Sequence, residues 1–164
     1  MGLQLPGELI SLLGMLGYTW PEADETKLFE LGSTWSSFAG RLNDIADSAD
    51  AAAQRVLSEN TGKEFEAFRT DWSGDESAVQ NLRTAARSCL AAGIGLFIAA
   101  GIVLALKINV IVQLVLLAIQ IAQAIAAAPA TFGASLGWIP IAKQIAGFVI
   151  EMLIDQAIGA LLGS

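Results

Sequence analysis

The sequence contains no histidine and only one cysteine, Cys89, among its 164 residues. A single cysteine permits no internal disulfide, and the usual zinc sites and Cys/His nucleophile pairs need residues that are missing here. We therefore expect no cofactor, no bound metal and no enzymatic activity. Positive charge is also scarce, since nine Lys and Arg stand against sixteen Asp and Glu. Nucleic-acid phosphates require a basic surface, so nucleic acid is not an expected partner.

The charge that is present is unevenly distributed. Residues 1–87 hold most of the acidic and basic side chains, whereas residues 88–164 hold only Lys107, Lys143, Glu151 and Asp155. Hydrophobic residues make up 54% of the chain, above the usual share of a soluble domain of about 45–50%. This contrast predicts an acidic helical region over residues 1–87 and a hydrophobic helical segment over residues 88–164, packed together as one module. The first residues lack the basic start of a secretory signal peptide and predict a short amphipathic helix.

Apolar side chains recur at steps of three and four residues from Leu28 to Val56. This heptad stripe predicts a long helix that begins after Asp24 and packs against a partner helix. We expect the stripe to form the core of a hairpin. Its members are Leu28, Leu31, Trp35, Phe38, Leu42, Ile45, Ala49, Ala52 and Val56.

A second apolar stripe follows and predicts the other arm of the hairpin. Asn60 and Gly62 are turn-forming residues between the two stripes, so we place the hairpin turn there. The second stripe includes Phe65, Phe68, Trp72, Val79 and Leu82, and Gly74 is a weak point within it. The predicted fold is all-α: a long antiparallel helical hairpin followed by two to three strongly hydrophobic helices, which form a helical bundle or insert into a membrane.

The hydrophobic segment permits several interpretations. Residues 89–106 carry no charge or amide and are long enough for a transmembrane helix. After Lys107, four amides lie along one side of the next helix, where they could bond to another helix in a bilayer, line a pore or face water: Asn109, Gln113, Gln120 and Gln123. Two acids are costly inside a membrane, so Glu151 and Asp155 favour an amphipathic last helix. An exposed polar face is also a commoner role for such a pair of acids than catalysis.

The first half resembles a known family. Trp20, Pro21, Glu22 and the later Trp35 match a "WPE…W" pattern, and two long amphipathic helices are joined by a turn ending in glycine. The chain is similar to the Trp-x-Gly (WXG) superfamily of type VII secretion substrates, and most similar to the N-terminal modules of actinobacterial polymorphic toxins. In that alignment Phe68 and Trp72 occupy the aromatic positions of the second arm, while Asn60 replaces the tryptophan of the turn.

The resemblance implies a function and a set of partners. Family members are exported without a signal peptide, by a signal in which an acid follows a tyrosine at the fourth position, and Tyr18 and Glu22 have that spacing. The implied function is a non-enzymatic targeting and export module of a secreted toxin, which pairs with a small WXG-like helical partner or with itself and engages the type VII machinery. The alternatives are a small membrane or pore-forming protein that contacts lipid, and a soluble helical oligomerisation module. The corresponding location is secreted or membrane-associated.

Overall fold

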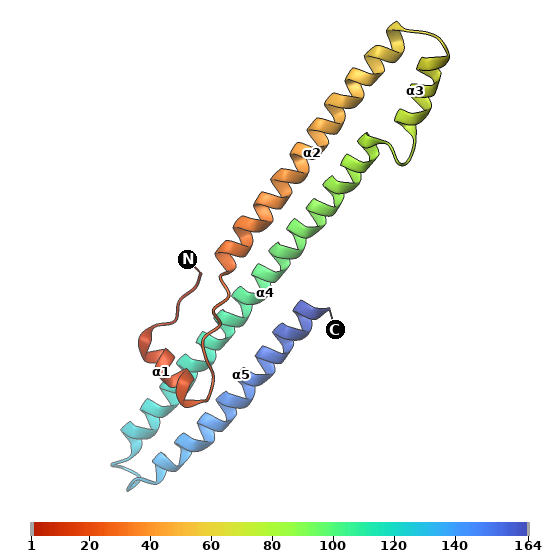
Figure 1. Cartoon of the computed structure of the whole chain (residues 1–164). Coiled ribbons are helices and arrows are strands. Elements are labelled where there is room, and N and C mark those ends of the chain that lie inside the picture. The colour runs from red at the N-terminus through yellow and green to blue at the C-terminus, as the bar shows by residue number, and fades with distance from the viewer. Residues whose placement is uncertain (1, 164) are drawn as a thin grey trace. The chain divides into compact units, whose positions relative to one another are not determined.

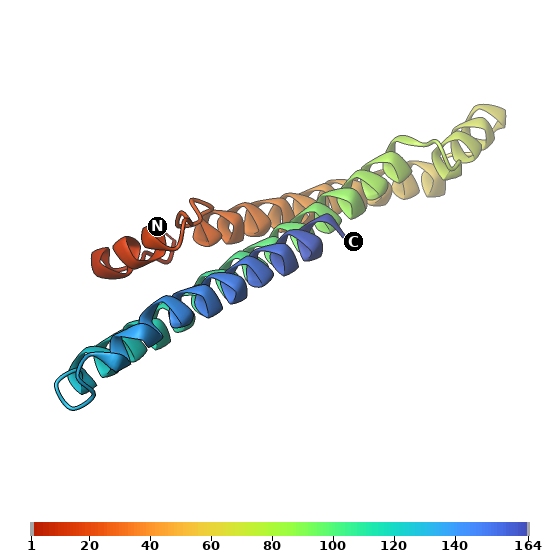
Figure 2. The ribbon, with the colours of Figure 1, turned by 90° about the horizontal axis from the view of Figure 1, so that it is seen from below.

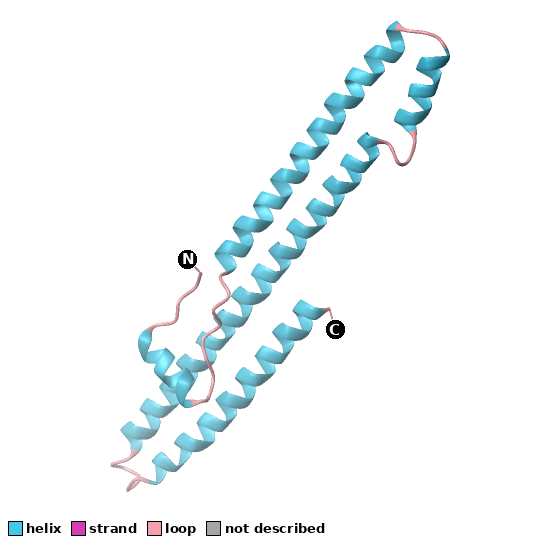
Figure 3. Ribbon diagram, in the orientation of Figure 1, coloured by secondary structure: helices cyan, strands magenta, loops and turns pink. Residues whose placement is uncertain are grey.

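The computed structural model describes residues 2–163, and every regular element within them is a helix (Figure 3). The predicted all-α fold is therefore confirmed. The elements in chain order are α1 (Gly7–Met15), α2 (Glu25–Glu59), α3 (Lys63–Ser73), α4 (Ala78–Ala127), the 3-10 helix η1 (Ala134–Gly137) and α5 (Trp138–Leu162).

These helices form two compact units. The first unit combines Met1–Lys27 with Ala99–Ser164, and the second is the continuous stretch Leu28–Ile98. We call them the discontinuous unit and the continuous unit. The predicted boundary between residues 87 and 88 lies within α4, which contributes its first part to the continuous unit and its second part to the discontinuous unit.

In the continuous unit, α2 runs antiparallel to an arm made of α3 and the beginning of α4 (Figure 1). The chain reverses at residues 60–62, between α2 and α3. The Asn60 side chain donates a hydrogen bond of 2.8 Å to the Val56 carbonyl at the end of α2. Gly62 has φ of 133°, a value that L side chains rarely adopt. Local turn chemistry therefore separates the two helices here.

The second arm is itself interrupted at residues 74–77. Gly74 adopts an extended conformation with ψ of 151°, which ends α3 after Ser73. The Ser77 hydroxyl then accepts a hydrogen bond of 3.3 Å from the Gln80 amide and caps the start of α4. Trp72, Ser73 and Gly74 thus lie at a break within the second arm, some distance beyond the hairpin reversal.

In the discontinuous unit, α5 lies alongside the later part of α4 in both views (Figures 1 and 2). The N-terminal residues 2–24, which we call the strap, cover one face of this helix pair with α1. The buried core combines all three parts. It consists of Leu5, Leu12 and Leu13 from the strap, Val110, Leu114 and Leu117 from α4, and Ala142, Ala146 and Ile150 from α5.

Candidate functional site

The face of α2 that packs inside the continuous unit is made of small residues. Gly32, Ala39, Ala46 and Ala53 recur at every seventh position and are all buried. Val79, Ala86 and Gly93 repeat at the same spacing on the second arm and are buried as well. Small side chains at heptad spacing allow two helix backbones to approach closely. We call these two rows the small-residue interface.

The two helices approach closely where Gly32 faces Gly93. A Cβ atom placed on Gly93 would lie 2.7 Å from the Ser36 hydroxyl and 2.9 Å from the Gly32 carbonyl oxygen. A Cβ on Gly32 would lie 2.8 Å from the Phe97 ring. All three distances are shorter than real Cβ contacts, so this packing requires glycine at both positions. Phe97 fills the neighbouring space and its ring centroid lies 5.4 Å from that of Phe29.

The predicted heptad stripe occupies the adjacent face of α2. Leu28 and Leu42 are half-buried, but other large members of the stripe remain exposed to solvent. We call these exposed side chains the apolar face of α2: Leu31, Trp35, Phe38, Ile45 and Val56, with exposed fractions from 41% to 54%. We expected this stripe to form the internal core, and the structure differs. The smaller side chains of the adjacent face let α2 and α4 approach closely, so the two helices pack through that face instead. The large side chains are left available to another molecule.

The aromatic residues of α3 contact the other end of α2. Trp72 donates a hydrogen bond of 2.9 Å from Nε1 to the Asp50 carboxylate, and its ring centroid lies 5.5 Å from that of Phe68. Phe65, Phe68 and Trp72 are half-buried. Further along, Arg83 forms an ion pair of 2.8 Å with Asp47. Leu82 is half-buried and Val79 is buried, so these predicted second-arm residues lie on the packed side of the hairpin.

The discontinuous unit contains a buried ion pair that the sequence gives no local reason to expect. Lys107 Nζ lies 2.8 Å from Glu25 Oε2, and the two side chains are only 2% and 7% exposed. The same ammonium donates a hydrogen bond of 2.7 Å to the Ala23 carbonyl. The Trp20 ring centroid lies 5.7 Å away, within cation–π range. We call this arrangement the lysine clasp.

The clasp sets the ionisation of Glu25. Burial by itself would raise the pKa of this carboxyl group, because it disfavours the charged form. Hydrogen bonds from the Lys107 ammonium and the Leu3 amide outweigh burial and lower the pKa to about 2. The Glu25 carboxyl group is therefore ionised at neutral pH, and it compensates the Lys107 ammonium inside the core.

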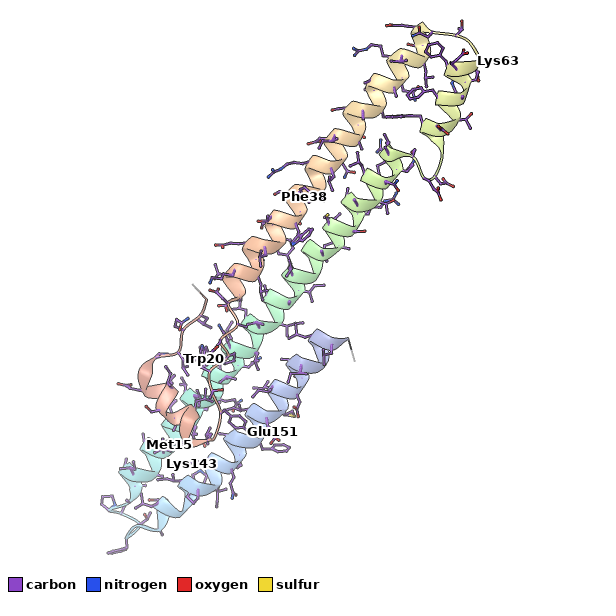
Figure 4. The ribbon with its side chains drawn as sticks, in the orientation of Figure 1. Met15, Trp20, Phe38, Lys63, Lys143 and Glu151 are labelled. Atoms are coloured by element: carbon purple, nitrogen blue, oxygen red, sulfur yellow. The ribbon has the colours of Figure 1, made fainter. Side chains whose placement is uncertain are left out.

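The tyrosine of the candidate export signal also takes part in holding the strap. Tyr18 is half-buried and donates a hydrogen bond of 3.2 Å to the Gly147 carbonyl of α5. Glu22 is exposed, and the adjacent Trp20 and Pro21 are half-buried against the clasp. Figure 4 labels Trp20 and Met15 on this strap, beside the later part of α4.

The four predicted amides follow the outside of α4. Asn109, Gln120 and Gln123 are exposed and Gln113 is half-buried. Asn109 also lines a shallow groove of about 240 Å³ together with Gln156 and apolar residues of α4 and α5. Glu151 and Asp155 are exposed on α5. Among residues 2–163, no three His, Cys, Asp or Glu side chains are grouped closely enough to hold a metal ion.

The continuous unit is thus a helical hairpin whose α2 keeps a row of large apolar side chains exposed. A family model described as a WXG100 like domain matches residues 4–149, which is most of the chain. The protein therefore belongs to the WXG100-like domain family, and the resemblance of the first half to the WXG superfamily is confirmed at that level. No curated protein and no solved structure matches the chain significantly.

Proposed function

We propose that this chain is a non-enzymatic export module of a toxin secreted by the type VII system. We further propose that the apolar face of α2 binds a small WXG-like helical partner or a second copy of the chain. The exposed large side chains on that face carry the proposal. Membership in the WXG100-like family supports a secretion-related or oligomerising role.

Association is favourable because the packing inside the continuous unit leaves large apolar side chains of α2 exposed. The small-residue interface joins α2 to α4 without burying Leu31, Trp35 or Phe38. Removing such side chains from water contributes about 25 cal/mol per Å² of apolar surface. A partner that lays a helix along this face gains that contribution, and aromatic residues are common binding hot spots. The packing inside the chain and the packing against a partner thus use different faces of one helix.

Association is tested by placing a charge on this face. Trp35→Asp should leave the free chain folded with only a modest loss of thermal stability, because Trp35 is 41% exposed. It should weaken self-association, or binding to a co-expressed small WXG-like protein, by about 2 kcal/mol or more, roughly thirtyfold in Kd. Sedimentation equilibrium measures the first and titration calorimetry the second. Ser33→Asp is the matched control, since Ser33 is exposed on the same helix outside the stripe. Equal affinities for the two variants would refute the proposed face.

Export is tested separately in a host that carries a type VII system. Residues 1–87 are deleted from the longest natural form of the protein, and secretion into the medium is measured. We expect secretion to stop, because the deletion removes both the apolar face and the Tyr18 to Glu22 signal. The variant Ser33→Asp, at an exposed residue of α2 outside the stripe, serves as the control and should leave export intact. Secretion that continues after the deletion would remove the basis of the export proposal.

A second candidate function is that of a membrane-embedded or pore-forming protein. The stretches Lys63–Ala127 and Ala134–Leu162 are long and apolar enough to cross a bilayer by length and composition, and only 28% and 11% of their most apolar windows are buried. The paired and buried Lys107 and the exposed acids of α5 weigh against two complete spans. Recovery of the chain as a soluble species without detergent would exclude this candidate and leave the export module or a soluble oligomerisation module.

A further inference from the structure

The end of the α4–α5 helix pair is devoid of charge. No Asp, Glu, Lys or Arg occurs between Lys107 and Lys143 in the sequence. The two helices are joined within this run by residues 128–137, and we call residues 124–142 the tip. Several large apolar side chains are exposed on it: Ile125, Phe132, Leu136, Trp138 and Ile141.

Phe132 is the most exposed of these side chains, with a relative accessibility of 101%. Its backbone has φ of 49°, in the left-handed region that residues other than glycine seldom adopt. The following residue, Gly133, has φ of 86°. The loop thus holds a bulky ring away from the protein in a conformation that costs free energy. Folding alone gives no reason to favour a large apolar residue at this position.

The polar groups of the tip are bonded to one another. The Thr131 hydroxyl donates to the Ala127 carbonyl at 3.0 Å, and its oxygen accepts from the Ser135 amide at 3.2 Å. The Ser135 hydroxyl donates to the Ala124 carbonyl at 2.7 Å. The amides of Thr131 and Gly133 donate hydrogen bonds to the carbonyls of Ala127 and Ala128. Such internal pairing is what a loop needs in order to leave water without losing hydrogen bonds.

We propose that this tip enters the surface of a lipid bilayer, with Phe132 and Trp138 as its anchors. A protein partner is usually recognised through polar groups around an apolar centre. This tip pairs both of its hydroxyl side chains internally and presents a projecting, uncharged, aromatic end instead. A hydrocarbon phase accepts such an end without offering hydrogen bonds, and Trp side chains favour the boundary between lipid and water.

The charges of α5 set the depth of insertion. Lys143 is the first charge after the tip, and its long side chain can extend to lipid phosphates while its stem lies in apolar surroundings. The rise from Trp138 to Lys143 along a helix is about 8 Å. This length matches the depth to which interfacial helices enter the boundary between headgroups and acyl chains. Glu151 and Asp155 lie further along α5 and are exposed, so they remain in water (Figure 4 labels Lys143 and Glu151). The contact is therefore shallow and does not require a span.

The test uses the whole chain with Cys89→Ser and one new cysteine carrying an environment-sensitive dye. The dye is placed at Leu136→Cys on the tip, or at Ile158→Cys near the far end of α5 as the control, since these residues are similarly exposed at 42% and 49%. The probes are vesicles of phosphatidylcholine mixed with phosphatidylglycerol. We expect a blue shift and increased emission at position 136 only, with stronger quenching by spin labels near the headgroups than by labels at the chain ends.

Substitutions then identify the anchor. Phe132→Asp should lower vesicle partitioning about tenfold or more in flotation, since a fully exposed aromatic ring loses its burial in lipid. Phe148→Asp, on an exposed residue of α5 beyond Lys143, should have little effect. Trp35→Asp should not change partitioning, which separates this proposal from the partner-binding proposal. An unchanged dye spectrum at position 136, equal losses for both phenylalanine variants, or stronger quenching from the chain ends would each overturn shallow insertion of the tip.

Discussion

The lysine clasp permits a quantitative prediction about the strap. In Glu25→Gln the shape of the side chain is nearly kept, but Lys107 loses the negative charge 2.8 Å away. Breaking a buried ion pair by removing one partner costs about 3–5 kcal/mol. The Ala23 carbonyl and the Trp20 ring still face the ammonium, so we expect the lower end of that range, about 3 kcal/mol. The strap should then open roughly a hundred times more often.

Hydrogen–deuterium exchange is the suitable assay because it reports on the strap separately from the rest of the chain. Amides of α1 should exchange about a hundredfold faster in Glu25→Gln at pH 7, consistent with about 3 kcal/mol. Glu22→Gln is the control, since Glu22 is an exposed acid of the strap. The double variant Glu25→Leu with Lys107→Met should recover most of the protection, because an apolar pair replaces a buried ion pair with little loss.

The same pair predicts a dependence on acid. The pKa of Glu25 is about 2 in the folded chain and 4.5 for the unperturbed group, so the folded state favours the ionised form. The stabilisation is therefore complete above about pH 4.5 and is lost as the pH falls toward 2. In Glu25→Gln, the protection of strap amides against hydrogen exchange should not show this decrease at low pH. Equal exchange rates for the wild type and Glu25→Gln at pH 7 would refute the stabilising role of the clasp.

Two further predictions concern the continuous unit. Gly93→Ala should lower the free energy of unfolding by about 1–3 kcal/mol in urea denaturation, because the new methyl group meets the Gly32 backbone. Gly95→Ala, where nothing lies within 4 Å, should instead raise it by about 0.5–1 kcal/mol through helix propensity, and the same sign for both would contradict the close approach. Trp72→Phe should cost about 1 kcal/mol by removing the hydrogen bond to Asp50, and no further loss is expected when Asp50→Ala is already present.

The helical periodicity of the sequence predicted the fold class, but it pointed to the large apolar stripe as the internal face of α2, whereas several of its large members are exposed. The heptad stripe stands out because Trp35 and Phe38 are large, whereas Ala39 and Ala46 add little to a hydrophobic pattern. Backbone approach makes the small side chains the better internal contact, as Gly32 and Gly93 illustrate. The seven-residue recurrence of Gly and Ala was present in the sequence and could have indicated this interface.

Sequence patterns did not predict the lysine clasp, for a different reason. Glu25 and Lys107 are 82 positions apart, and no local period relates them. Lys107 stood out in the sequence only as a charge between two apolar stretches. Nothing in the sequence indicated that the partner would come from the first residues of α2. The break at residues 74–77 was easier to anticipate, since Gly74 interrupts the second apolar stripe.

The division of the chain into a continuous and a discontinuous unit imposes an order on folding. Residues 28–98 are contiguous, so their hairpin can form as soon as that stretch has left the ribosome. The strap must wait for the rest of α4 and for α5, because Tyr18 bonds to a residue 129 positions later. Contacts of such long separation form slowly. Until they form, the apolar side chains of α1 that belong to the core of the discontinuous unit, Leu12 and Leu13, stay exposed to water.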